Sequence, residues 1–259
     1  MMRDFELEKN LQSTIDSGKS VWVIGDIHGY NKTFDALIKK LNINEKDIIL
    51  CLGDLIDKGP GSLEVLKTVS KSNQIFSIRG NHEEMMRLSI SPKHGRMMKS
   101  WLKYGGQITL ESFSKEETNQ IEEARKWLSF IENLPTEIVL NKFRIVHAGY
   151  EDSGSLEDQN NQQKIWGRTI FQVKKILDNG RQIIVGHSPV QTLNRLGKDD
   201  IWISEITLAD GRPSVLCIDT GVFLEGNLYP RLTALNLTNS QIITQEKLEN
   251  YWFNPPSSN

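Results

Sequence analysis

The stretch VWVIGDIHG (residues 21–29) joins four consecutive apolar residues to a turn that carries Asp26 and His28. The apolar run is rich in valine and isoleucine and does not alternate with polar residues, which is typical of a strand buried on both faces. In open α/β sheets, ligands bind just beyond the carboxyl ends of the strands. The stretch therefore predicts a buried strand that delivers an aspartate and a histidine to a functional site.

The same pattern, a short apolar run that ends in glycine and polar residues, recurs along the chain. It is found at residues 48–54 (IILCLGD), 75–83 (IFSIRGNHE), 143–149 (FRIVHAG), 183–189 (IIVGHSP) and 215–221 (VLCIDTG). Each run predicts another buried strand with a polar cluster at its end.

Helical periodicity separates several of these runs. Apolar residues spaced by three and four positions predict helices at residues 34–41, 63–69, 121–131 and 170–177, with Ser62 as the N-cap of the second helix. Alternating strands and helices indicate an α/β fold. Strand-like segments at 201–206, 215–218, 232–237 and 241–244 suggest a second sheet packed against the first, and residues 153–164 predict a polar surface loop. We expect one domain over residues 1–259.

Composition excludes several classes of protein. The 259 residues include 31 Lys+Arg and 33 Asp+Glu, a net charge of −2, which argues against a nucleic-acid partner or a polybasic membrane-surface protein. No apolar run approaches the roughly 18 residues of a membrane span, and the charged N-terminus does not resemble a signal peptide. Cys51 and Cys217 both lie in apolar runs and are expected to be buried free thiols. These features predict a cytoplasmic protein.

The polar clusters, taken together, predict a metal site. Six nitrogen or oxygen donors follow the predicted strands: Asp26, His28, Asp54, Asn81, His147 and His187. Imidazole and carboxylate ligands without a thiolate suit Mn, Fe or Zn. Neighbouring glycines allow the backbone to approach a metal or a phosphate closely. Six donors suffice for two metals if one carboxylate bridges them.

The ordered motifs resemble a known family. GDIHG (25–29), GDLIDKG (53–59), RGNHE (79–83), HAG (147–149) and GHSP (186–189) are similar to the signature of the calcineurin-like metallophosphoesterases, in their phosphoprotein-phosphatase branch. WLKYGGQITLESF (101–113) and IWGR (165–168) are similar to segments of bacterial and phage serine/threonine protein phosphatases. The resemblance implies two mixed β-sheets in a sandwich flanked by helices.

The resemblance also implies a dinuclear metal site. Asp26 and His28 would bind one metal, Asp54 would bridge, and Asn81, His147 and His187 would bind the other. Two divalent ions are implied, with Mn²⁺ expected and Fe or Zn as alternatives. A hydroxide that bridges the metals would attack phosphorus in line.

Four further residues receive roles from the resemblance. His82 would be the general acid that protonates the leaving oxygen, and Asp57 would orient it. Arg168 would bind the phosphate. Lys58 stands where protein phosphatases of this family usually have arginine, and it would contribute a point charge in place of two parallel hydrogen bonds.

Three functions follow as hypotheses. The first is hydrolysis of phosphomonoesters, with phosphoserine and phosphothreonine proteins as the substrate class and small phosphorylated molecules as other partners. The second is an ApaH-like hydrolase that cleaves the phosphoanhydride of dinucleoside polyphosphates. The lysine at position 58 gives the motif a resemblance to this branch. The third is a non-catalytic scaffold, which is disfavoured because such proteins usually lose ligands or the acid, and none is missing here.

Residues beside the motifs are expected to be structural. Arg79 is assigned a structural role in preference to a phosphate contact, and Glu83 is expected to support the site without binding a metal. Trp22, Trp101 and Trp127 are interpreted as core or half-buried packing residues.

Overall fold

The computed structural model describes residues 3–91, 97–113, 119–193, 201–225 and 228–253. Two five-stranded mixed sheets lie at its centre, with strand orders β10-β9-β1-β2-β3 and β4-β5-β6-β8-β7. The strands are β1 (Val21–Ile24), β2 (Ile48–Cys51), β3 (Ile75–Ser77), β4 (Glu137–Val139), β5 (Phe143–Val146), β6 (Gln182–Val185), β7 (Trp202–Ile203), β8 (Val215–Cys217), β9 (Arg231–Asn236) and β10 (Ile242–Glu246). The expected two-sheet sandwich is confirmed.

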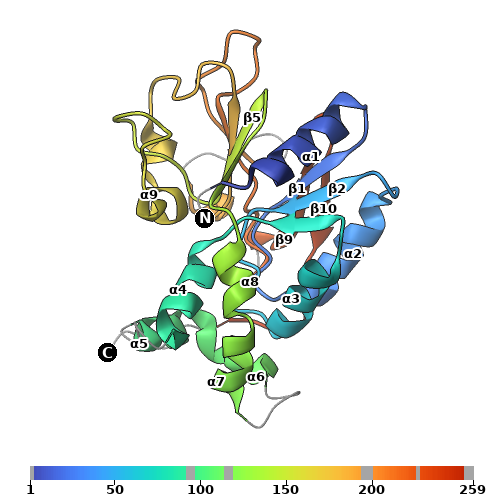
Figure 1. Cartoon of the computed structure of the whole chain (residues 1–259), viewed down its shortest axis with the longest axis vertical. Helices are drawn as coiled ribbons and strands as arrows, with labels where there is room; N and C mark the ends of the chain where they lie inside the picture. The colour runs from blue at the N-terminus through green and yellow to red at the C-terminus, as the bar shows by residue number, and fades with distance from the viewer. Residues whose placement is uncertain (1–2, 92–96, 114–118, 194–200, 226–227, 254–259) are drawn as a thin grey trace.

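Helices flank the sandwich (Figure 1). They are α1 (Phe5–Asp16), α2 (Asn31–Leu41), α3 (Ser62–Lys71), α4 (Asn81–Ile90), α5 (Met98–Trp101), a kinked turn (Leu102–Gly106), α6 (Gln107–Phe113), α7 (Gln120–Lys126), α8 (Leu128–Asn133) and α9 (Asn161–Trp166). Short 3₁₀ turns lie at Thr169–Gln172 and Val190–Thr192. In Figure 1, α4 to α8 gather in the lower half of the molecule, whereas β5 and α9 lie at the upper left. No helix in the described ranges is long and apolar enough to cross a membrane.

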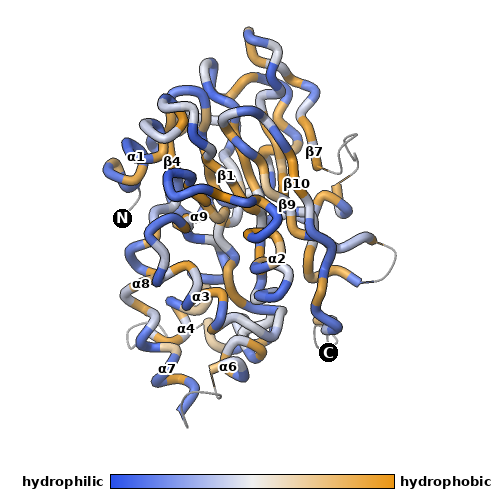
Figure 2. The backbone as a smooth tube through the Cα atoms, turned by 90° about the vertical axis from the view of Figure 1, so that its right-hand side faces the viewer, coloured by the Kyte–Doolittle hydropathy of each residue, from blue (hydrophilic) through white to orange (hydrophobic). Residues whose placement is uncertain are grey.

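Most strands are buried on both faces, as their sequences predict, whereas β10 is only half-buried. In β1, Val21 and Val23 face the apolar layer between the two sheets, while Trp22 and Ile24 face the layer beneath the helices. This alternation follows from the two-residue period of a strand. In Figure 2 the hydrophobic colour follows the strands through the middle of the molecule. Both cysteines are buried and free, as predicted.

The late strands divide between the sheets, which corrects one prediction. Residues 232–237 and 241–244 were expected in the second sheet, but β9 and β10 belong to the first. β9 pairs antiparallel with β1, with Val23 opposite Leu235, and β10 pairs with β9. This pairing buries Leu235 between the sheets and Ala234 beneath the helices. The burial of both faces of β9 therefore accounts for its pairing with β1.

Helix predictions are correct early in the chain and fail later. Residues 34–41 and 63–69 lie in α2 and α3, although α3 begins at Ser62 with Gly61 as its N-cap, so Ser62 is not the cap. Residues 121–131 form two helices, α7 and α8. The helix predicted at 170–177 is wrong, because only the 3₁₀ turn forms and Val173 is extended. There Ile170 is buried, and the Phe171 ring meets the Trp202 ring edge to face with 5.0 Å between their centres, so the apolar residues pack without forming a helix.

A buried ion network ties α9 to the second sheet. Lys164, which was predicted to end a surface loop, lies in α9 and is fully buried, with its Nζ 2.5 Å from Glu137 Oε1. Glu137 Oε2 also accepts from the Tyr150 hydroxyl at 2.5 Å and lies 3.2 Å from the Arg144 guanidinium. The Lys164 carbonyl accepts from the Ala148 amide at 2.8 Å. The network therefore fixes the loop that follows β5.

Glu137→Ala should lower the free energy of unfolding by about 3–5 kcal/mol, because two buried cations lose their shared carboxylate. Lys164→Met is the matched control, since Glu137 then keeps Arg144 and Tyr150 as partners and the loss should be clearly smaller. Urea unfolding followed by circular dichroism measures both variants. Equal losses would mean that Glu137 does not organise the network.

Candidate metal centre and active site

The two sheets bring their polar loops to one place. β1, β2 and β3 run parallel, as do β5, β6 and β8, so the carboxyl ends of each set share one edge. The loops at these ends carry the six predicted metal ligands: Asp26 and His28 after β1, Asp54 after β2, Asn81 after β3, His147 after β5 and His187 after β6. Asp26, His28, Asp54, Asn81 and His147 are buried, and His187 is half-buried.

Backbone strain concentrates in these loops. Among the described residues, eight other than glycine have positive φ, and five of them are predicted site residues: His28, Asp54, Asp57, Lys58 and His187. Left-handed conformations are costly for side chains of this kind and persist only where surrounding structure enforces them. The loops are therefore shaped for the positions of their side chains.

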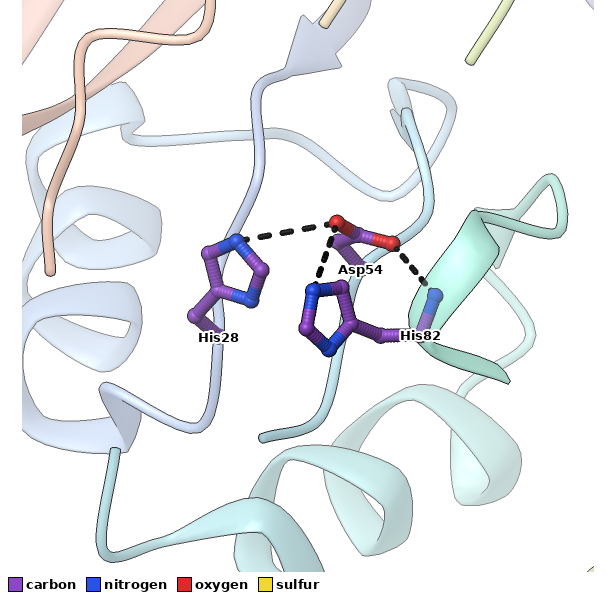
Figure 3. A group of neighbouring side chains, drawn as sticks. All are labelled: His28, Asp54 and His82. Atoms are coloured by element: carbon purple, nitrogen blue, oxygen red, sulfur yellow. Dashed lines mark hydrogen bonds and ion pairs between the residues drawn. The ribbon is translucent and has the colours of Figure 1, made fainter. Parts of the chain in front are cut away.

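Asp54 lies at the centre of the site. Its Oδ2 is 3.6 Å from His28 Nε2 and 3.8 Å from His82 Nε2, and its Oδ1 is 3.4 Å from His147 Nε2. The His82 amide donates to Oδ1 at 3.0 Å. Figure 3 shows His28 and His82 both directed toward this carboxylate. The two oxygens of Asp54 thus face two different groups of side chains.

The second group contains Asn81, His147 and His187. Asn81 Oδ1 lies 2.9 Å from His147 Nε2 and 2.7 Å from His187 Nδ1. The potential ligand atoms of Asp54, His147 and His187 lie within 4.8 Å of one another, as do those of His28, Asp54 and His82. Two candidate metal positions therefore share Asp54.

Asp26 is placed differently from the other predicted ligands. Its two carboxylate oxygens accept from the His187 amide at 3.2 and 3.0 Å, and His82 takes its place in the compact group around His28. Asp26 nevertheless lies near the other carboxylates of the site. Burial and the nearby Asp219 and Asp54 raise its pKa well above the usual value. Asp26 as a ligand stays a prediction.

The protonation of the site fits a divalent cation. Burial holds the pKa of His28 and His187 well below the usual value and also lowers that of His147, so the rings offer neutral nitrogen lone pairs. Burial opposes the ionisation of Asp54, but the positive charges of His147, His82 and His28 in their protonated forms, and that of Lys58, hold its pKa below the usual value. Burial raises the pKa of Asp219 to about 6. Crowded buried carboxylates beside neutral imidazoles are a donor set that positive metal ions stabilise.

Two glycines make room for the carboxylates. A Cβ on Gly80 would lie 2.2 Å from Asp54 Oδ1, and a Cβ on Gly186 would lie 2.1 Å from Asp26 Oδ1. At Gly80 the added Cβ would also lie 2.4 Å from the Asp54 backbone nitrogen, so only glycine fits there, whereas a side chain at position 186 would push the Asp26 carboxylate aside.

His82 and Asp57 form a buried pair beside the ligands. His82 Nδ1 is 2.6 Å from Asp57 Oδ2, and Asp57 has no exposed surface. Because Nδ1 is engaged by the carboxylate, Nε2 is the nitrogen left for chemistry. This geometry is the one that the general-acid prediction requires.

Lys58 and Arg168 both line a pocket at this site, and the pocket has a volume of about 300 Å³. Lys58 Nζ lies 2.9 Å from His28 Nε2 and 3.7 Å from the centre of the Phe223 ring. Burial lowers the pKa of its ammonium, and the neighbouring carboxylates, Asp54 foremost, oppose that shift. Arg168 is exposed, and its Nε is 3.3 Å from His187 Nε2. Both cations are thus placed for an anionic substrate.

Glu83 and Arg79 have the structural roles that the sequence predicts for them. The Glu83 carboxylate accepts from the amides of Asp54, Leu55 and Gly80 at 2.7–2.8 Å, which confirms a supporting role. Arg79 bonds to the Glu84 carboxylate at 3.2 Å and the Leu134 carbonyl at 3.3 Å, which confirms a structural role.

Sequence reasoning missed two contributors to the site. Asp219 is buried at the end of β8, and its Oδ2 has no hydrogen-bond partner in the structure. The signal was available, since DTG (219–221) follows a buried strand as the ligand motifs do. Phe223 contacts both Lys58 and His28, the latter at a ring separation of 5.0 Å, and no sequence pattern marks it.

Comparisons with known proteins agree with this geometry. A family model described as calcineurin-like phosphoesterase matches residues 19–220. A serine/threonine-protein phosphatase 2 from Escherichia coli is 30% identical over 175 residues, which cover 65% of this chain and 76% of that protein. A symmetrical bis(5'-nucleosyl)-tetraphosphatase from Wigglesworthia glossinidia brevipalpis is 46% identical over 66 residues, about a quarter of each chain.

A solved structure shows the shared fold. A protein serine/threonine phosphatase from Saccharomyces cerevisiae, with similarity to human phosphatase PP5, superposes with a TM-score of 0.58 at 16% identity. The superposition covers 94% of this chain and 91% of the yeast chain. With the family model matching most of the chain, the protein belongs to the calcineurin-like phosphoesterase family and is a metal-dependent phosphoric-ester hydrolase.

Proposed function

We propose that the protein is a dinuclear-metal phosphatase that hydrolyses phosphomonoesters, with phosphoserine and phosphothreonine in proteins as its substrate class. The observation that carries the proposal is the position of Asp54 between two groups of ligands, with the His82–Asp57 pair beside them. One site would then combine metal binding with a proton donor for a poor leaving group.

In this proposal the six predicted ligands would hold two divalent ions, and Mn²⁺ is the ion to test first. Asp26, His28 and Asp54 hold one ion, and Asn81, His147 and His187 hold the other with Asp54 shared. When bound, the ions supply an activated water as nucleophile and positive charge for the phosphoryl oxygens. The protein supplies donors that are fixed by burial and neutral where the ligand is histidine.

The remaining roles belong to side chains around the pocket. Lys58 and Arg168 orient the phosphoryl group and offset its charge, Lys58 from the buried wall and Arg168 from the exposed rim. His82 donates a proton from Nε2 to the leaving oxygen, while Asp57 holds Nδ1 and stabilises the ring in its charged state.

The names of the relatives support two substrate classes. The longer of the two matches described above is to a protein named serine/threonine-protein phosphatase, which favours phosphomonoesters on proteins. The shorter one is to a protein named bis(5'-nucleosyl)-tetraphosphatase, which favours a phosphoanhydride. Because the match to the protein phosphatase extends over 175 residues and that to the tetraphosphatase over 66, we place the phosphomonoester first.

A direct assay separates these classes. With Mn²⁺ added, the protein should release phosphate from phosphoserine and phosphothreonine peptides and from p-nitrophenyl phosphate, and the peptides should have the higher kcat/KM relative to diadenosine tetraphosphate. Preferential cleavage of the dinucleotide into two nucleotide products would instead assign the protein to the anhydride hydrolases.

Asp54→Asn should reduce bound metal more than any other single ligand substitution, because Asp54 faces both ligand groups and its charge screens the two cations from each other. Elemental analysis after dialysis measures the metal content per chain. Asp57→Asn is the matched control and should keep its metal, since Asp57 lies outside both groups. A variant Asp54→Asn that retains two metals would refute the bridging role.

His82→Asn should affect substrates according to their leaving groups. A seryl alkoxide needs a proton to leave, whereas p-nitrophenolate departs readily without one. General acid catalysis contributes about 10²–10⁴-fold, so that loss should appear on phosphoserine peptides and be much smaller on p-nitrophenyl phosphate. Steady-state kinetics with both substrates provide the measurement. If the two losses are equal while metal content is unchanged, His82 binds phosphate and is not the acid.

A further inference from the structure

The segment 101–109 of the WLKYGGQITLESF motif encloses the Asp57 carboxylate. Trp101 ends α5, the kinked turn Leu102–Gly106 follows, and Thr109 lies in the first turn of α6. Trp101 and Thr109 have no exposed surface. The sequence suggested only that Trp101 packs in the core, and neither residue has a part in the function proposed so far.

Both side chains donate to Asp57. Trp101 Nε1 lies 3.1 Å from Oδ1 and 3.0 Å from Oδ2, and the Thr109 hydroxyl donates to Oδ1 at 2.6 Å. His82 Nδ1 occupies Oδ2 at 2.6 Å. The Asp57 amide in turn donates to Thr109 Oγ1 at 2.9 Å. Both oxygens of the carboxylate and its backbone amide are therefore held from fixed directions.

Two glycines let the segment come this close. Gly105 has φ +113°, and a Cβ there would lie 2.6 Å from the Lys58 amide nitrogen. A Cβ on Gly106 would lie 2.5–2.6 Å from the Trp101 ring. Tyr104 and Gly105 have non-helical backbone angles, so the chain kinks between α5 and α6. Here the turn seats the indole against Asp57 while the chain passes directly over Lys58.

We propose that Trp101 and Thr109 are positioning residues that act through Asp57 on His82. This inference rests on the proposed role of His82 as the acid. A buried carboxylate with a single imidazole partner would have an unsatisfied oxygen and freedom to rotate. The indole N–H and the threonine hydroxyl fix its plane, so that Oδ2 points at Nδ1 and the imidazole presents Nε2 in one orientation. Hydrogen bonds to an ionised group are strong enough for this purpose.

The competing role for Trp101 is packing, since it belongs to the apolar cluster beneath the helices. Trp101→Phe separates the two roles, because phenylalanine keeps most of the ring and removes only the N–H donor. Trp127 provides a matched control: it packs against the same cluster, and its Nε1 is buried without a hydrogen-bond partner in the structure. Thr109→Val removes the other donor at nearly constant volume, and Thr109→Ser restores it.

The experiment measures kcat and KM of the Mn²⁺-loaded full chain on a phosphoserine peptide and on p-nitrophenyl phosphate. Trp101→Phe and Thr109→Val should each lower kcat on the peptide by roughly tenfold, the scale of one hydrogen bond to a charged group, with KM nearly unchanged. The loss on p-nitrophenyl phosphate should be much smaller. Thr109→Ser should recover most of the activity, and Trp127→Phe should match the parent protein.

A double-mutant cycle completes the test. In a His82→Asn background, Trp101→Phe should cause no further loss, because the group through which it acts is gone. A further loss there, or equal losses on both substrates in the single variant, would overturn the inference and leave Trp101 a packing residue. If His82→Asn itself shows no dependence on the leaving group, the acid role fails, and this inference fails with it. The two failures are distinguishable because only the second alters the His82→Asn result.

Discussion

The negative charge of Asp54 lies between two groups of donors, and the rest of the site is arranged around it. Its two oxygens face His28 and His82 on one side and His147 on the other. A buried carboxylate stays ionised only where nearby groups stabilise its charge. Parallel strands from two sheets make this possible, because their carboxyl ends carry the required side chains to a single edge.

Support for the centre comes from side chains outside the two groups of candidate ligands. The Glu83 carboxylate accepts hydrogen bonds from the amides of Asp54, Leu55 and Gly80, and these bonds join the loops after β2 and β3. On the other side of the centre, Asp57 is held by an indole and a hydroxyl. The site thus depends on a surrounding layer of hydrogen bonds as much as on its ligands.

Much of this arrangement could be predicted from sequence, because it is encoded locally. Apolar runs such as 48–52 specify buried strands, and the polar residues after them specify where ligands gather. What escaped prediction depends on partners distant in sequence. The sheet of β9 follows from its pairing with β1, and the burial of Lys164 follows from Glu137. Trp101 carries the general pattern of a core residue, and nothing local indicates that its N–H faces a carboxylate.

The glycines beside the carboxylates divide the site into parts with different freedom to evolve. A side chain at Gly80 would displace Asp54, and one at Gly186 would displace the Asp26 carboxylate. These two glycines, the floor of the site, therefore tolerate little change. The rim of the pocket is formed in part by Tyr104, Trp166 and Arg168, of which Tyr104 and Arg168 are exposed to solvent. Selection can therefore remodel which molecule enters while the reacting centre stays constant. One ancestral floor is in this way compatible with descendants that bear the names of protein phosphatases and of dinucleotide hydrolases.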